Sequence, residues 1–149
     1  MEVKIHKQSL EIESTTQIEF MDITSKVQDI VDKSGIREGH VAIYAPHTTM
    51  GIVVNHNEPM LIQDFMRILY KVVPMDDRYS HDLFELRKGT GKSDARSNGH
   101  SHCKSILVGV SEIIPLDRGK IMISNSQSIF AVEFDGARKR DIVVQVMGI

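Results

Sequence analysis

The chain has 149 residues, the usual length of one domain and too short for two ordinary ones. Hydrophobic residues make up 41% and charged residues 26%, which is typical of globular proteins and excludes a disordered chain. The net charge of −2 and the short apolar runs argue against nucleic acid and membrane partners. One cysteine and an N-terminus unlike a signal peptide predict a cytoplasmic protein with a single domain over residues 1–149.

The first predicted elements are two strands and a helix. Apolar residues alternate over 3–12 and again over 18–20, so we expect two strands joined by a turn at 14–16, forming a hairpin. A short amphipathic helix follows, with Thr24 as its predicted N-cap and Gly35 as its left-handed end.

The next segment has a short polar corner between two apolar runs. Residues 40–45 and 50–54 read as buried strands on either side of the corner 47–49. Asn57 is predicted to cap a second helix, which carries a broad apolar stripe and ends at Pro74.

Residues 75–99 form a long polar connection, and such connections are usually functional or disordered. Beyond Cys103 the apolar signal returns in five short runs, which we interpret as a strand-rich half: 106–108, 113–115, 121–123, 129–134 and 142–146. The Asp135-Gly136 turn favours pairing of the last two strands. We therefore predict an α+β fold, a single compact domain with a mostly antiparallel or mixed sheet and two or three helices.

A histidine pair is the first candidate for chemistry. In an extended backbone His100 and His102 would project to the same face and reach one divalent metal, whereas in a helix they would point roughly 200° apart. His47 or His81 could add a third imidazole. Imidazole ligands suit Zn²⁺ better than Mg²⁺. The alternative is a pair of solvated loop histidines.

Acids, cations and amides supply further candidates, each with a plainer alternative. Glu58 in the first turn of the second helix could act on a ligand or merely complement the helix dipole. Arg138 and Arg140 could clamp a phosphate or carboxylate, although basic turns are usually just solvated. The polar run Ser124–Gln127 between two strand signals suggests pocket lining or a bulge.

Several clusters together resemble the YjbQ-like family, whose members are often described as secondary thiamine-phosphate synthases. They are His47-Thr48-Thr49-x-Gly51-Ile52, Asn55-x-x-Glu58-Pro59, Tyr79-x-His81, Asn98-Gly99-His100-Ser101-His102, Gly109 and Glu133-Phe134-Asp135-Gly136-x-Arg138-x-Arg140. The resemblance implies a compact α+β fold, a homotrimer with sites near subunit boundaries, and a common site that could hold a metal. That site would contain His47, Asn55, Glu58, His81, His100 and His102.

One segment departs from the family pattern. Where the family usually has Gly-Thr-Trp-Gln, this chain has Ser124-Asn125-Ser126-Gln127 and no tryptophan at all. Only Gln127 matches, so the loss of a large aromatic surface predicts a changed pocket or a different substrate.

Two kinds of function follow as expectations. The first is a small-molecule enzyme with metal-assisted chemistry on a phosphorylated substrate, either a transferase like thiamine-phosphate synthase or a metal-dependent hydrolase. The second is a non-catalytic trimer that binds a metal or an anion. The candidate catalytic residues are Glu58, His47, Asn55 and Gln127; the candidate substrate-binding residues are Thr48, Thr49, Arg138, Arg140 and Glu133; and the candidate metal ligands are His81, His100, His102 and His47.

Overall fold

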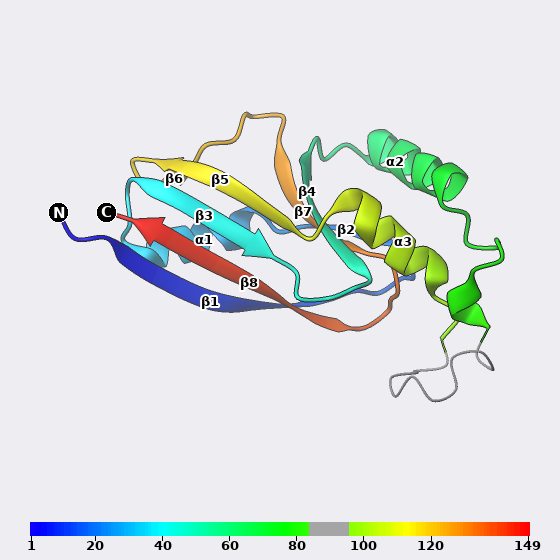
Figure 1. Ribbon diagram of the computed structural model, residues 1–149. Helices are drawn as coiled ribbons and strands as arrows, with labels where there is room; N and C mark the ends of the chain where they lie inside the picture. The colour runs from blue at the N-terminus through cyan, green and yellow to red at the C-terminus, as the bar shows by residue number, and fades with distance from the viewer. Residues whose placement is uncertain (84–95) are drawn as a thin grey trace.

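The computed structural model describes residues 1–83 and 96–149. Its strands form two antiparallel sheets (Figure 1). The larger sheet has the order β1-β8-β3-β5-β6, with bounds Lys4–Glu13, Lys139–Gly148, Gly39–Tyr44, Ser111–Asp117 and Lys120–Ile121. The smaller sheet has the order β2-β7-β4, with bounds Glu19–Asp22, Ser128–Glu133 and Met50–Asn55. The helices are α1 (Thr24–Ser34), α2 (Pro59–Val72), the short 3₁₀ helix η1 (Ser80–Asp82) and α3 (Gly99–Val108). The predicted α+β class and single compact domain are confirmed.

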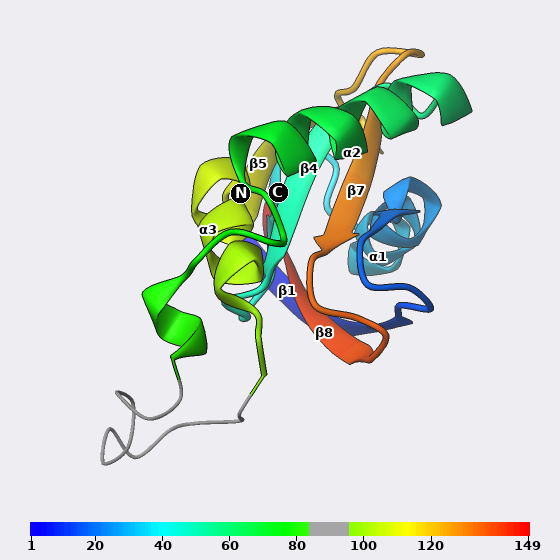
Figure 2. The ribbon, with the colours of Figure 1, turned by 90° about the vertical axis from the view of Figure 1, so that its right-hand side faces the viewer.

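The core lies between the sheets and α1. Strand residues alternate between faces, so the central strand β7 serves two hydrophobic clusters. Ile129 and Ala131 join the main cluster with α1 and the larger sheet. Phe130 and Val132 belong to a second cluster on the other face, toward α2, whose axis crosses β4 and β7 in Figure 2. Both faces of β7 are therefore covered, which makes it the most buried strand of the smaller sheet.

Both predicted hairpins are wrong, because the chain changes sheets at each predicted turn. β1 pairs with β8 and β2 with β7, so residues 14–18 cross from the larger sheet to the smaller one. Residues 134–138 cross back between β7 and β8. The two crossovers lie side by side: the Gly136 N–H donates to the Gln17 carbonyl at 3.0 Å. A Cβ at Gly136 would lie 2.1 Å from the Thr16 carbonyl oxygen, so this close approach requires glycine.

The helix ends were predicted in the right places, but both predicted N-caps are wrong. Gly35 closes α1 in the left-handed conformation with φ of 69°, as expected. The Thr24 hydroxyl, however, donates to Asp22, so Thr24 does not cap α1. The N-cap of α2 is Glu58 and not Asn57, whose amide donates to Asp22 instead.

The segment after residue 98 is helical, contrary to the extended backbone on which the histidine-pair argument relied. α3 contains both His100 and His102, and it also takes in Ile106–Val108, which was predicted as a strand. In a helix, side chains two residues apart point in different directions, so the H-x-H spacing does not bring both imidazoles to one metal ion. No helix in the described part of the chain is long and apolar enough to cross a membrane.

Candidate functional site

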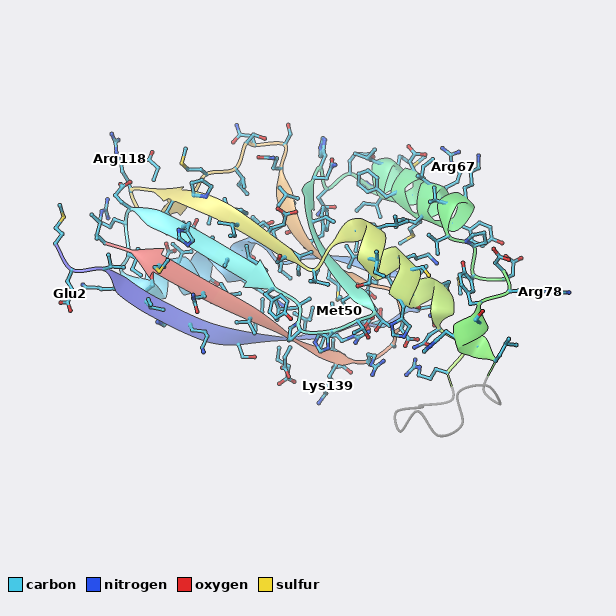
Figure 3. All side chains as sticks on the ribbon, viewed as in Figure 1. Glu2, Met50, Arg67, Arg78, Arg118 and Lys139 are labelled. Carbon is cyan, nitrogen blue, oxygen red and sulfur yellow. The ribbon has the colours of Figure 1, made fainter. Side chains whose placement is uncertain are left out.

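Three chain segments meet at one end of the smaller sheet and enclose a polar cavity. They are the β3–β4 corner, the start of α3 and the crossover from β7 to β8, a region that Met50 and Lys139 mark in the lower middle of Figure 3. The cavity has a volume of about 280 Å³. Its walls are made by Pro46, His47, Thr48, Thr49, Asn98, His102, Asp135, Arg138 and Arg140. Five residues of the predicted catalytic and substrate-binding sets, His47, Thr48, Thr49, Arg138 and Arg140, therefore share one cavity with His102 of the metal set.

A buried ion pair forms the floor of this cavity. Arg140 Nε donates to Glu133 Oε1 at 2.9 Å, and its Nη2 donates to the other carboxylate oxygen and to Thr49 Oγ1. The side chains of Arg140 and Glu133 are 3% and 0% exposed. Ser14 also donates to Glu133 at 2.8 Å. Glu133, predicted as a substrate-binding residue, thus lies behind Arg140 and holds it in place.

The pKa of Glu133 reflects this setting. Burial raises the pKa, but hydrogen bonds from Arg140, Ser14 and the Asp135 N–H, together with the charge of Arg140, outweigh burial and lower it. Glu133 is therefore ionised at neutral pH, and the pair holds no proton for transfer.

Asp135 organises the cavity wall. Its buried carboxylate accepts from Asn98 at 3.0 Å, from Arg96 at 3.0 Å and from Arg138 at 3.3 Å. Two arginines therefore share one carboxylate, while Arg140 is balanced by its own carboxylate. Among the described residues around the cavity, arginines outnumber carboxylates, and the excess positive charge favours an anionic ligand.

His100 is buried and held by Lys104, one helical turn further along α3. Lys104 Nζ lies 2.7 Å from His100 Nδ1, and both residues are buried: His100 is 2% exposed and Lys104 is 0% exposed. Burial lowers the pKa of Lys104 to about 8. Burial first, and then the Lys104 charge, lower the pKa of His100, so the imidazole is neutral at pH 7.

This contact decides which ring nitrogen of His100 carries the proton. A protonated Lys104 donates to Nδ1, so the hydrogen of the neutral ring is on Nε2. A nitrogen that carries hydrogen has no lone pair for a metal. His100 could therefore coordinate an ion only after Lys104 loses a proton.

The other candidate metal ligands lie near the cavity. The rings of His81 and His102 are 4.6 Å apart between centroids and meet edge to face. His81 Nε2 contacts Asn98 Oδ1 at 3.0 Å. His47 Nε2 lies 2.9 Å from the Asp141 carbonyl, which can only accept, so Nε2 carries a hydrogen and Nδ1 is the ring nitrogen that could bind a metal. Within residues 1–83 and 96–149 no three His, Cys, Asp or Glu side chains are arranged to hold one ion.

The remaining candidates lie at the opposite end of the smaller sheet. In the β4–β7 register Met50 pairs with Glu133 beside the cavity, whereas Asn55 pairs with Ser128, next to Gln127. Five strand residues at about 3.3 Å each separate the two ends by roughly 17 Å. Within one chain, Asn55, Gln127 and Glu58 are therefore not brought together with the histidines.

Gln127 and Glu58 have local structural partners. Gln127 accepts from the Ser124 N–H at 2.9 Å, so the run Ser124–Gln127 is an exposed turn and not a strand bulge. Glu58 accepts from the Met60 and Leu61 N–H groups at 3.0 and 2.7 Å. These two backbone hydrogen bonds lower the pKa of Glu58.

Replacing Glu58 with glutamine is expected to lower the midpoint of thermal unfolding, because the neutral amide is a weaker partner for the helix N-terminus. Turnover should change little. A proton-transfer role would instead cost about 10²- to 10⁴-fold in kcat. Glu58→Asp is the matched control, since aspartate is a preferred N-cap and should keep the melting midpoint. Calorimetry and steady-state kinetics measure both; a large kcat loss in Glu58→Gln with an unchanged melt would make Glu58 catalytic.

Sequence reasoning missed Lys104 entirely and gave Asp135 no role beyond its turn. The signal for Lys104 was its spacing of four from His100, which places both on one helical face, but it becomes visible only if the segment is taken as a helix. Asp135 was interpreted as a turn residue and as part of a family cluster, but it was not among the candidate site residues. Its three partners come from residues distant in sequence or across the turn, and no local pattern reveals them.

Comparison with known proteins gives a consistent result. The family described as UPF0047 protein YjbQ-like matches residues 8–149. A UPF0047 protein of Methanothermobacter thermautotrophicus is 33% identical over 146 residues, covering 98% of this chain and 94% of that protein. The UPF0047 protein YugU of Bacillus subtilis is 33% identical over 141 residues, covering 94% and 98%.

Solved structures agree with these relatives. A YbjQ-like protein of unknown function from Sulfolobus solfataricus has a TM-score of 0.89 and 29% identity, covering 99% of this chain and 100% of its own. A hypothetical protein from Aeropyrum pernix has a TM-score of 0.86 and 26% identity, covering 97% and 99%.

Proposed function

From the premise that the chain belongs to the UPF0047 YjbQ-like family, we propose that it is an enzyme acting on a small phosphorylated molecule in the cavity between the β3–β4 corner, α3 and the β7–β8 crossover. The observation that carries the proposal is the excess of arginine over carboxylate around Asp135, in a cavity that also contains two imidazoles. Guanidinium groups bind phosphate oxygens through paired hydrogen bonds.

The charged and histidine residues that line the cavity have distinct roles in this proposal. Arg138, about two-fifths exposed and anchored by its backbone to Ser14, presents its guanidinium to the phosphate. Arg140 is fixed by Glu133 and stabilises negative charge that develops on leaving oxygens. His47 and His102 line the same cavity, and histidine is the side chain that exchanges protons near neutral pH.

A divalent metal is a further part of the proposal. His81 and His102 fit two positions of a transition-ion site, because their rings are adjacent, and His47 shares the cavity with His102. Imidazole donors suit Zn²⁺ better than Mg²⁺, and a bound ion would polarise phosphate oxygens as a Lewis acid. His100 is the weakest member of the predicted ligand set, since Lys104 occupies its Nδ1.

The protein as purified is expected to contain a divalent transition metal that the His102→Ala variant loses, together with its turnover in a screen of phosphorylated metabolites. Elemental analysis measures the metal, and release of phosphate or pyrophosphate measures turnover. His56→Ala is the control, because His56 is an exposed imidazole beside Asn55, at the far end of the sheet. Equal metal content in the two variants would contradict the ligand assignment, and unchanged turnover in His102→Ala would contradict the site.

One observation favours a second candidate, a trimer that binds an anion or metal without turnover. The acids nearest the cavity, Glu133 and Asp135, are both paired with arginines, so neither is positioned as a proton-transfer group. Metal or phosphate binding without turnover in the metabolite screen would support this alternative. For either function we propose a homotrimer, supported by the family resemblance and by exposed apolar side chains such as Ile68 and Ile113. Light scattering should give about three times the chain mass of 16.8 kDa.

A further inference from the structure

A second, apolar cavity lies beside the polar one. The second cavity has a volume of about 530 Å³ and shares His47, Thr48 and His102 with the first. Its remaining walls are Ser105, Ile106, Gly109 and Val110. The shared residues make the two cavities neighbouring halves of one concave surface.

The helical spacing of α3 explains why the cavity lining changes from polar to apolar along this helix. His102, Ser105, Ile106 and Gly109 recur at intervals of three and four residues, so they line one face of the helix and its C-terminal end. The face begins with the imidazole of His102 beside the arginines. It continues with the side chain of Ile106, which is 83% exposed.

The polar groups of this second wall are already used by the fold. Ser105 Oγ donates to the Met50 carbonyl at 2.6 Å. The Gly109 carbonyl accepts from the Ile52 N–H at 3.0 Å, and the Val110 carbonyl accepts from the Ala45 N–H at 2.9 Å. The wall therefore offers a ligand mainly apolar contact.

Cavity size also argues for a ligand that uses both halves. Small-molecule sites usually enclose about 300–1,000 Å³, and the polar cavity alone, at about 280 Å³, lies just below that range. The apolar half lies within it. Inorganic phosphate would leave this larger half unused.

We infer that the ligand of this site is amphipathic: a phosphate or similar anionic group in the polar half, joined to an apolar, ring-sized body that lies against Ile106, Gly109 and Val110. The inference rests on the proposed function and adds the chemical class of the substrate. The anion sets the orientation through Arg138, and covering the exposed Ile106 side chain adds affinity.

Two stable phosphonates test whether the site binds an anionic group in one half and an apolar body in the other. Methylphosphonate presents the anionic group alone, and phenylphosphonate adds a ring; titration calorimetry of the protein as purified gives both Kd values. Burying a ring at roughly 25 cal/mol per Å² corresponds to about 10- to 100-fold tighter binding of phenylphosphonate. Ile106→Ser should reduce that ratio strongly and leave the Kd of methylphosphonate unchanged.

Leu107→Ser is the matched control. Leu107 is the next residue of α3 and is 59% exposed, but it is not among the residues that line the apolar cavity, so its variant should keep the full ratio. Equal affinity for the two probes, or a ratio unaffected by Ile106→Ser, would overturn the amphipathic ligand while leaving the anion site intact. Failure of both probes to bind would refute the proposed anion site itself.

Discussion

Replacing Glu133 with alanine is expected to lower the free energy of unfolding by about 3–5 kcal/mol, the usual cost of removing one partner of a buried ion pair. The variant leaves Arg140, with a side chain 3% exposed, as a buried charge whose remaining recorded partner is Thr49. It also removes the acceptor of the Asp135 N–H, and the Ser14 hydroxyl and the Phe134 N–H each lose one of their two acceptors. Urea unfolding followed by circular dichroism measures the change.

Two further variants make this prediction specific. Glu11→Ala removes an exposed carboxylate from β1 and should change stability by no more than about 0.5 kcal/mol. The double variant E133L/R140M removes both charges together, and replacement of a buried pair by apolar residues is often neutral or stabilising. The double variant should therefore be more stable than Glu133→Ala. An equally unstable double variant would show that the ion pair is not the cause.

The same pair gives the protein a defined acid sensitivity. The folded-state pKa of Glu133 is lowered below its ordinary value of 4.5, so its contribution is complete above that pH. The contribution is lost as pH falls from there through the folded-state pKa, because the unfolded chain binds the proton more readily. The stability difference between wild type and Glu133→Ala should shrink over this acidic range and stay constant from pH 6 to 8.

Replacing Arg138 with methionine is expected to lower kcat/KM for the phosphorylated substrate by about 10²- to 10³-fold, because the variant loses the guanidinium that binds the phosphate. The fold should survive, because Arg138 is tied to Ser14 through its backbone N–H and carbonyl, which methionine retains. Steady-state kinetics on the substrate from the metabolite screen, with a thermal melt, separate the two effects.

Arg118→Met is the control for this variant. Arg118 lies on the β5–β6 turn with a side chain 84% exposed, at the far end of the larger sheet in Figure 3, and its loss should leave kcat/KM unchanged. Arg138→Lys should recover part of the activity, since lysine keeps the charge but loses the paired geometry. A normal kcat/KM in Arg138→Met would remove this arginine from the site.

The sequence by itself determined the type and approximate position of most elements. The periodic apolar residues of α1 and α2 and the left-handed Gly35 are local signals, and each matches the structure. Such signals depend only on neighbouring residues, so they can be recognised from a single sequence. The clusters at 47–49, 98–102 and 133–140 were also enough to indicate the family, which the comparisons confirm.

Only the tertiary structure decided which elements pair and what their polar residues do. A turn residue such as Gly136 shows that the chain reverses, but not that it enters another sheet beside Gln17. Ser14 and Glu133 are 119 residues apart, and no local pattern predicts their hydrogen bond. His100 looked like a metal ligand in an extended segment, yet α3 places it against Lys104. Long-range packing sets these partners, because burial leaves each charged group with the few polar atoms that the fold brings within reach.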